Sequence, residues 1–199
     1  MKTTYRKLFF LPILALITIS LSGCGYNTLV TMEESVDGAW SQVENQYQRR
    51  ADLIPNLVNT VKGYADFEKS VLTEVTEARS KVGQTQLSAD DLSDPVKFQQ
   101  FQDAQDQLSG ALSRLLVVVE AYPELKANEN FLALQAQLEG TENRIAVERK
   151  RFNDAVQLYN TEIRTFPTLI TAGLFGFKDK QYFKSKEGSD QVPEVNFNK

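Results

Sequence analysis

Histidine is absent from the 199 residues, and cysteine occurs only once, at Cys24. Without histidine the chain cannot hold a histidine-based catalytic triad, most kinds of zinc site, or the Glu-x-x-His ligands of di-iron bundles. A lone cysteine can form neither an internal disulfide nor a thiolate metal cluster. The residues therefore predict no catalytic group, no metal site and no cofactor.

Glycine and proline are scarce, with 10 and 6 residues, whereas the helix formers Ala, Leu, Glu, Gln and Lys are abundant. This balance favours an all-helical domain. Charged residues make up 24% of the chain and apolar residues 42%, which is typical of one globular domain with a core. The net charge of −4 makes the chain a poor partner for nucleic acid, because phosphate binding needs clustered basic residues. The expected partners are proteins and a membrane.

The N-terminus has the features of a targeting segment. Residues 2–7 carry three basic side chains and no acidic one, and Leu8–Leu21 is an apolar run. A run of about 14 residues is shorter than the roughly 20 needed to span a bilayer, but normal for a signal peptide. The tetrapeptide Leu21–Cys24 (LSGC) resembles the lipobox of bacterial lipoproteins, in which the cysteine is acylated and the chain is cut before it.

These features predict lipidation of Cys24, with residues 1–23 as a lipoprotein signal peptide and residues 24–30 as a lipidated tether. Two alternatives remain: an uncleaved single-pass anchor in the inner membrane, or an ordinary signal peptide with an incidental cysteine. In the lipoprotein reading, the domain lies on the extracytoplasmic side of the envelope.

Apolar residues recur at heptad-like spacing from Val36 to Val82, which predicts one long helix that begins at a capping box, Thr31–Glu34. Pro55 lies inside this helix, where it predicts a kink or a break. A second helix is expected from the Asp94 N-cap to Tyr122, and a third from Asn128 to Pro167, with a short helical turn at residues 123–127 and a polar loop at residues 83–94.

Long amphipathic helices must bury their apolar stripes against one another. The pattern predicts an all-α, elongated, antiparallel up-and-down bundle over residues 31–183 with coiled-coil-like packing. It has three long helices plus a short fourth element, or four helices if the first breaks near Pro55. Residues 184–199 form a polar C-terminal tail.

Arg50 and Glu148 are polar residues at apolar seam positions of the first and third helices. In an up-down-up bundle these two helices run parallel, which places both residues at a similar height. We predict a partly buried structural ion pair between them that sets the helix register. The alternative is a recognition site within the polar cluster Gln48–Asn56. The apolar patch Leu169–Phe177 is too short to span a membrane. It is expected to cap the open end of the bundle, the alternatives being a membrane interface or a partner.

Long phrases of the sequence resemble the LemA family. They are Gly25–Val30 (GYNTLV), Ala39–Val58 (AWSQVENQYQRRADLIPNLV), Val61–Ala65 (VKGYA), Leu115–Phe131 (LLVVVEAYPELKANENF), Leu134–Asn160 (LQAQLEGTENRIAVERKRFNDAVQLYN), Ile163–Pro167 (IRTFP) and Gly176–Phe183 (GFKDKQYF). The resemblance implies a membrane-associated bacterial protein with an elongated helical bundle, usually described as four helices, and an N-terminal membrane anchor. The family has no established enzymatic activity, so no catalytic residue is carried over.

The expected function is that of a membrane-anchored envelope protein whose bundle is a non-enzymatic interaction or scaffold module for other envelope proteins. One alternative keeps this role with a single-pass anchor. The other is a hydrolase, which would need a concave site with converging titratable groups.

Overall fold

The computed structural model describes residues 2–64 and 67–184, with side chains from Gly25 onward. Its elements are α1 (Lys2–Lys62), α2 (Lys69–Gln84), the 3-10 helix η1 (Ala89–Ser93), α3 (Pro95–Val119), α4 (Pro123–Lys126), α5 (Glu129–Glu162) and α6 (Thr168–Phe175). The described residues contain no strand, which confirms the all-α class. The predicted tail, residues 184–199, lies outside the described residues apart from Lys184.

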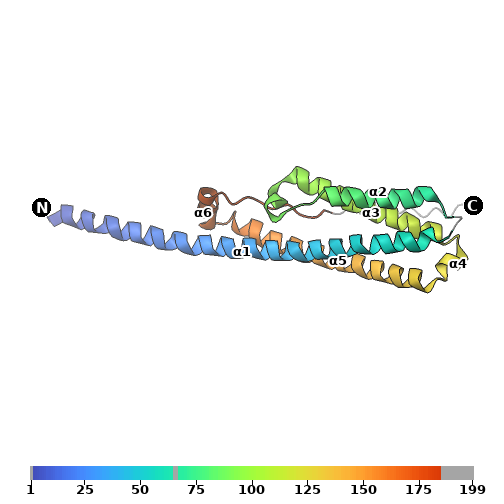
Figure 1. The fold of residues 1–199 in the computed structure, drawn as a ribbon. Coiled ribbons are helices and arrows are strands. Elements are labelled where there is room, and N and C mark those ends of the chain that lie inside the picture. The colour runs from blue at the N-terminus through green and yellow to red at the C-terminus, as the bar shows by residue number, and fades with distance from the viewer. Residues whose placement is uncertain (1, 65–66, 185–199) are drawn as a thin grey trace, which may run out of the picture.

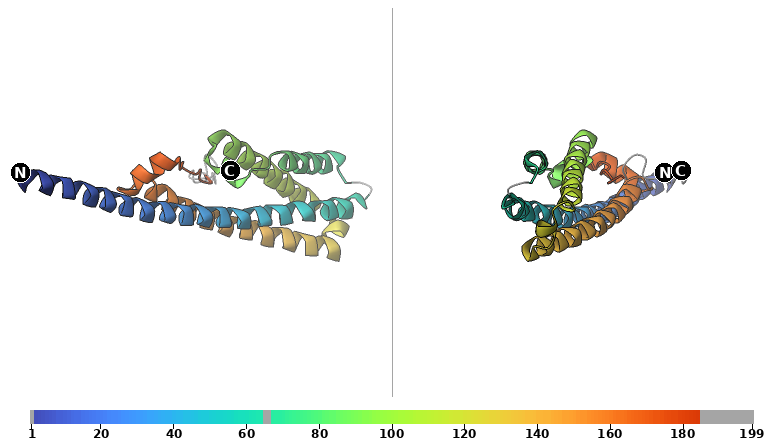
Figure 2. Two further views of the ribbon diagram at one scale, coloured as in Figure 1. Left: turned by 60° about the vertical axis from the view of Figure 1, so that its left-hand side comes forward. Right: turned by 90° about the vertical axis from the view of Figure 1, so that its right-hand side faces the viewer.

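The four long helices alternate in direction along an elongated rod (Figure 1). The chain runs out along α1, returns along α2, runs out again along α3 and returns along α5. Helix α5 packs along α1 and α2 packs along α3, and the views of Figure 2 show these two pairs side by side. Helix α6 and the last described residues therefore lie back at the N-terminal end of the bundle.

The first predicted helix is divided, but not at Pro55. Helix α1 continues through Pro55, whose ring is exposed, because Ile54 and Leu57 on the opposite face are buried in the core. The chain reverses instead between the end of α1 at Lys62 and the start of α2 at Lys69. The prediction of a break near Pro55 is therefore wrong.

The capping box predicted at Thr31–Glu34 is also wrong. Helix α1 already contains residues 24–30, so no helix begins at Thr31. The Thr31 hydroxyl donates to the carbonyl of Asn27 at 2.9 Å, as threonine does inside a helix. No proline separates the apolar run from the bundle, and α1 continues through both.

Two other helix starts are as predicted. The Asp94 carboxylate accepts hydrogen bonds from the backbone N–H groups of Val96 and Lys97 at the start of α3. The Asn128 side chain accepts from the N–H of Phe131 at 3.0 Å and begins α5. These caps satisfy backbone donors that have no partner within the helix. The predicted loop before α3 contains η1, which opens with a capping box of Ser88 and Asp91.

The core has two parts that lie on either side of Arg50. The part farther from α6 is mostly aliphatic and includes Leu57, Leu108 and Leu115. The part nearer α6 centres on the indole of Trp40. Four phenylalanine rings lie within about 6 Å of Trp40, contributed by α3, α5 and the chain after α6: Phe98, Phe101, Phe152 and Phe183.

Candidate functional site

The chain after α6 forms a strap, Gly176–Lys184, that lies in an extended conformation against the bundle. Gly176 ends α6 with a φ of 78°, a left-handed conformation that favours glycine. The strap then runs back along α5 in the opposite direction. The N–H of Gln181 donates to the carbonyl of Leu92 at 2.8 Å, which joins the strap to η1.

Two asparagine side chains of α5 hold the strap by its backbone. The Asn160 amide donates to the carbonyl of Lys180 and accepts from the N–H of Lys180, both at 2.9 Å. Asn153 makes the same pair of bonds with Phe183, at 3.0 and 2.9 Å. Seven residues of helix rise about 10 Å, and three residues of extended chain cover about 10 Å. This match in length lets one face of α5 bind the strap as a neighbouring strand would.

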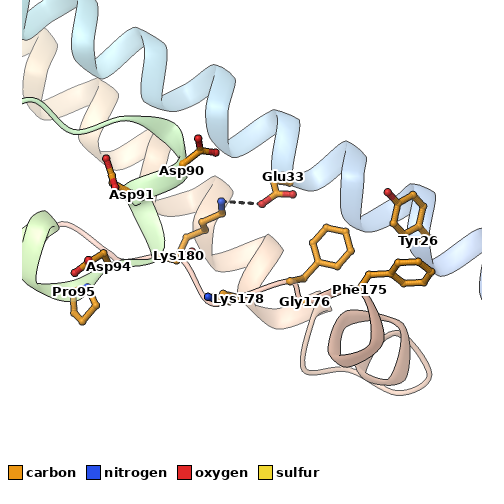
Figure 3. Close-up of a pocket in the computed structure, with 12 residues that line it drawn as sticks. Tyr26, Glu33, Asp90, Asp91, Asp94, Pro95, Phe175, Gly176, Lys178 and Lys180 are labelled. Atoms are coloured by element: carbon orange, nitrogen blue, oxygen red, sulfur yellow. Dashed lines mark ion pairs between the residues drawn. The ribbon is translucent and has the colours of Figure 1, made fainter.

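A pocket of about 820 Å³ lies between the strap, α1 and η1 (Figure 3). On one side the ammonium of Lys180, only 7% exposed, pairs with Glu33 of α1 at 2.8 Å. Three carboxylates from the η1 segment lie on the other side: Asp90, Asp91 and Asp94. Tyr26 and Phe175 close the end of the pocket nearest α6.

The charges around this pocket are held by structural contacts. Hydrogen bonds from Lys97 and Ser88 lower the pKa of Asp91 to about 2, so its carboxylate is ionised at neutral pH. Burial raises the pKa of Asp37, and the nearby Lys180 partly offsets this effect. Burial also raises the pKa of the Tyr159 phenol. Among the side chains described, no group of three or more His, Cys, Asp or Glu residues could hold a metal ion.

Arg50 lies in a polar layer between the two parts of the core and is only 1% exposed. Its guanidinium donates to Glu142 at 2.6 Å, to Ser109 at 2.7 Å, and to the Gln105 side chain. The guanidinium also lies over the ring of Tyr47, 5.1 Å from its centroid. These contacts connect α1, α3 and α5 at one level of the rod.

The predicted pair of Arg50 with Glu148 is wrong. Glu148 instead accepts from Arg151, one turn along α5, at 2.9 Å. The reason is the chain reversal after Lys62, which adds a helix and makes α5 antiparallel to α1 rather than parallel. In this arrangement Glu142 is the acidic residue of α5 that lies at the same height as Arg50 and pairs with it. A buried seam arginine with an acidic partner was predicted correctly, but the partner was not.

Helix α6 buries its small residues and exposes its large ones. Thr168, Thr171 and Ala172 are buried against the bundle. The exposed apolar side chains at this end are Phe166, Leu169, Ile170, Leu174 and Phe175. Of the patch Leu169–Phe177, which was expected to cap the bundle, Thr171, Ala172 and Phe177 pack against it, whereas the other large side chains are exposed. Cys24 lies in α1, but its side chain is outside the described ones, so its lipidation stays a prediction.

The strap was missed as a site by the sequence analysis. Asn153 and Asn160 are seven residues apart and lie on the side of the helix that carries Phe152 and Tyr159. Two amide side chains with this spacing beside a buried stripe are a signal for binding an extended segment. This spacing alone does not show which segment the two asparagines bind; the structure shows that it is residues 180–183.

Replacing Asn160 with aspartate is expected to release the strap while leaving the long helices intact. Aspartate can accept from the N–H of Lys180 but cannot donate to its carbonyl, so two acceptors would face each other in a buried position. We expect faster amide exchange at Lys180 and Phe183 in hydrogen–deuterium exchange experiments. Asn143→Asp, at an exposed position of the same helix, is the matched control and should leave these rates unchanged. Equal rates in both variants would contradict the role of Asn160.

Comparison with known proteins identifies the family. Residues 39–197 match the sequence model of the LemA family. The chain belongs to the LemA family. This match includes Arg50, both asparagines and the strap, but not residues 1–38, so the LemA family model does not cover the anchor region.

Curated relatives support this assignment along almost the whole chain. Magnetosome protein MamQ 2 of Paramagnetospirillum magneticum is 30% identical over an alignment 212 residues long. The alignment covers 94% of this chain and 78% of the relative. Magnetosome protein MamQ of Magnetospirillum gryphiswaldense is 30% identical over 196 residues, covering 90% and 71% of the two chains. Protein LemA of Metamycoplasma hominis is 25% identical over 189 residues, covering 93% and 82%.

Family membership and these relatives support a LemA-type protein associated with the membrane or envelope. Within residues 25–64 and 67–184, whose side chains the structure describes, no helix is both long and apolar enough to cross a bilayer.

Proposed function

We propose that this LemA-family chain is a membrane-anchored envelope protein whose bundle is a non-enzymatic interaction or scaffold module on the extracytoplasmic side. The observation that supports this proposal is the continuity of α1. The helix passes without interruption from the apolar run Leu8–Leu21 into the core around Trp40. Whether the anchor is acylated Cys24 or the apolar run itself, no flexible linker separates it from the bundle.

A rod attached in this way begins directly at its anchor and has a long exposed surface. From Gly25 to Lys62, α1 extends over about 55 Å at 1.5 Å per residue. The aromatic cluster and the Arg50 layer join α5 and α3 to it, so a force or a contact at the far end is transmitted to the anchor. These are properties of a scaffold.

A hydrolase is the second candidate, and the pocket of Figure 3 is the observation that favours it. Three of its four carboxylates, however, have structural roles: Asp91 in the η1 capping box, Asp94 in the α3 cap and Glu33 in the Lys180 ion pair. A general acid and base need two groups whose environments separate their pKa values around one substrate position. The pocket has no such pair beside a nucleophile among its described residues, which supports the scaffold role.

The intact mass of protein extracted from membranes tests the anchor. For a lipoprotein, wild type should have the mass of residues 24–199 plus attached acyl chains, and Cys24→Ala should retain residues 1–23. An unmodified chain of full length in both samples would contradict lipidation and indicate a single-pass anchor. Recovery of both proteins in the soluble fraction would contradict membrane anchoring itself.

Crosslinking in intact envelopes tests the scaffold role of the same protein. Mass spectrometry of the products is expected to identify crosslinks between the bundle and at least one other envelope protein. Crosslinks confined to the chain itself would count against a scaffold role.

A further inference from the structure

The exposed surface of α6 consists of large apolar side chains. Leu174 is 78% exposed, and Ile170, Leu169 and Phe175 are each more than half exposed. From Thr165 to Phe177 the chain contains no charged residue. Apolar area left in water is unfavourable by about 25 cal/mol for each Å². A cluster of large exposed apolar side chains in a soluble environment usually marks a surface that contacts something else.

This surface lies where the chain emerges from its proposed anchor. Helix α6 packs on α1 at Gly25, where an added Cβ would come within 3.4 Å of the Thr171 hydroxyl oxygen. The ring of Tyr26 lies 4.8 Å from that of Phe175. Figure 1 shows α6 beside α1 at the N-terminal end of the bundle. No charged residue occurs between Leu8 and Met32, so both chain segments at this end are uncharged.

We propose that the exposed face of α6 inserts into the interfacial region of the lipid bilayer, beside the N-terminal anchor. The inference rests on the proposed membrane anchor and adds a second point of contact with the lipid. Short helices with apolar faces bind at the boundary between headgroups and acyl chains, where their side chains leave water without crossing the membrane. Adjacency to the anchor supports lipid as the occupant, because the anchor already holds α6 at the height of the bilayer surface.

The second contact limits how the rod can tilt. A bundle held only through residues near Cys24 could pivot about that point. With α6 also in the interface, the line between the two contacts sets which side of the bundle faces the membrane. Phe166 and Phe175, at the two ends of the α6 segment, would hold it parallel to the surface.

Quenching of tryptophan fluorescence by brominated lipids tests this proposal in the full chain. Leu174→Trp is purified from membranes in detergent and reconstituted into phosphatidylcholine vesicles with brominated acyl chains. Leu132→Trp is the matched control, since Leu132 is an exposed leucine of α5 at the end of the rod far from α6. The wild-type emission of Trp40 is subtracted from both. We expect a large loss of emission for Leu174→Trp and no loss for Leu132→Trp.

The outcomes separate the two proposals. Vesicle flotation first shows whether the protein is anchored, and failure to float contradicts the proposed membrane anchor. Floating protein whose Leu174→Trp emission is not quenched overturns the inference about α6 while leaving the anchor intact. If that unquenched sample also forms crosslinked dimers through α6, the surface binds a second copy, which equally overturns insertion into lipid.

Discussion

Replacing Phe183 with alanine is expected to lower the free energy of unfolding by about 3 kcal/mol, at the lower end of values for buried phenylalanines, because the strap lies at the edge of the core. The Phe183 ring is 5.0 Å from Phe98 and 5.5 Å from Phe152, centroid to centroid. It also lies under the guanidinium of Arg149 at 4.4 Å. Truncation would leave a cavity where α1, α3 and α5 meet. Urea denaturation of the full chain in detergent, followed by circular dichroism, measures the change.

Tyr182→Ala is the matched control for this measurement. Tyr182 is the adjacent aromatic residue of the strap, but it is 37% exposed. Its removal should reduce the free energy of unfolding by less than about 1 kcal/mol. A loss below about 1 kcal/mol for Phe183→Ala as well would contradict a stabilising role for the ring of Phe183.

Replacing Glu142 with alanine is expected to lower the free energy of unfolding by about 2 kcal/mol, because it leaves the buried guanidinium of Arg50 without its anionic partner. Removing one partner of a fully buried pair usually costs about 3–5 kcal/mol. The expected loss is smaller here because the Glu142 side chain is 41% exposed, so water can partly replace it. The same urea titration measures this loss.

Glu148→Ala distinguishes the observed register from the parallel one. Among the described residues, Glu148 pairs with the guanidinium of Arg151, which is 68% exposed and would stay in water without it, so the Glu148→Ala change should cost less than about 1 kcal/mol. Both glutamates lie within α5, so helix propensity contributes equally to the two variants. A larger loss for Glu148→Ala than for Glu142→Ala would contradict the antiparallel arrangement of α1 and α5.

Local signals in the sequence were sufficient for much of the fold. The starts of α3 and α5 follow from one capping side chain each, Asp94 and Asn128, which act over three residues. The apolar seams identified the core, and most of the seam residues are buried. Periodicity cannot show where a long apolar pattern reverses direction, because both helices continue the same spacing. For that reason the reversal at Gly63 was missed and the exposed Pro55 was mistaken for it.

The site depends on long-range pairing, which is harder to predict. Which residue of α5 lies beside Arg50 depends on the direction of α5, and this depends on the number of helices before it. Because one reversal was not predicted, the predicted partner, Glu148, lies six residues from the observed partner, Glu142. The position of the strap could not be predicted from the sequence for a different reason. Residues 176–184 have no periodicity, and their position is determined by hydrogen bonds to Asn153 and Asn160 and by the aromatic pocket for Phe183.

The chain reversal after Lys62 also decides at which end of the rod α6 lies, and therefore whether its proposed contact with lipid is possible. With four long helices, each outward pass is matched by a return, and the C-terminal elements come back to the side where the chain started. With three, α6 and the strap would lie some 55 Å away at 1.5 Å per residue of helix, and the apolar face of α6 would point into the aqueous compartment. An even number of long helices thus makes the two ends of the rod different. The uncharged segments around α6 and the start of the bundle lie at one end, and the connections from α1 to α2 and from α3 to α5 lie at the other.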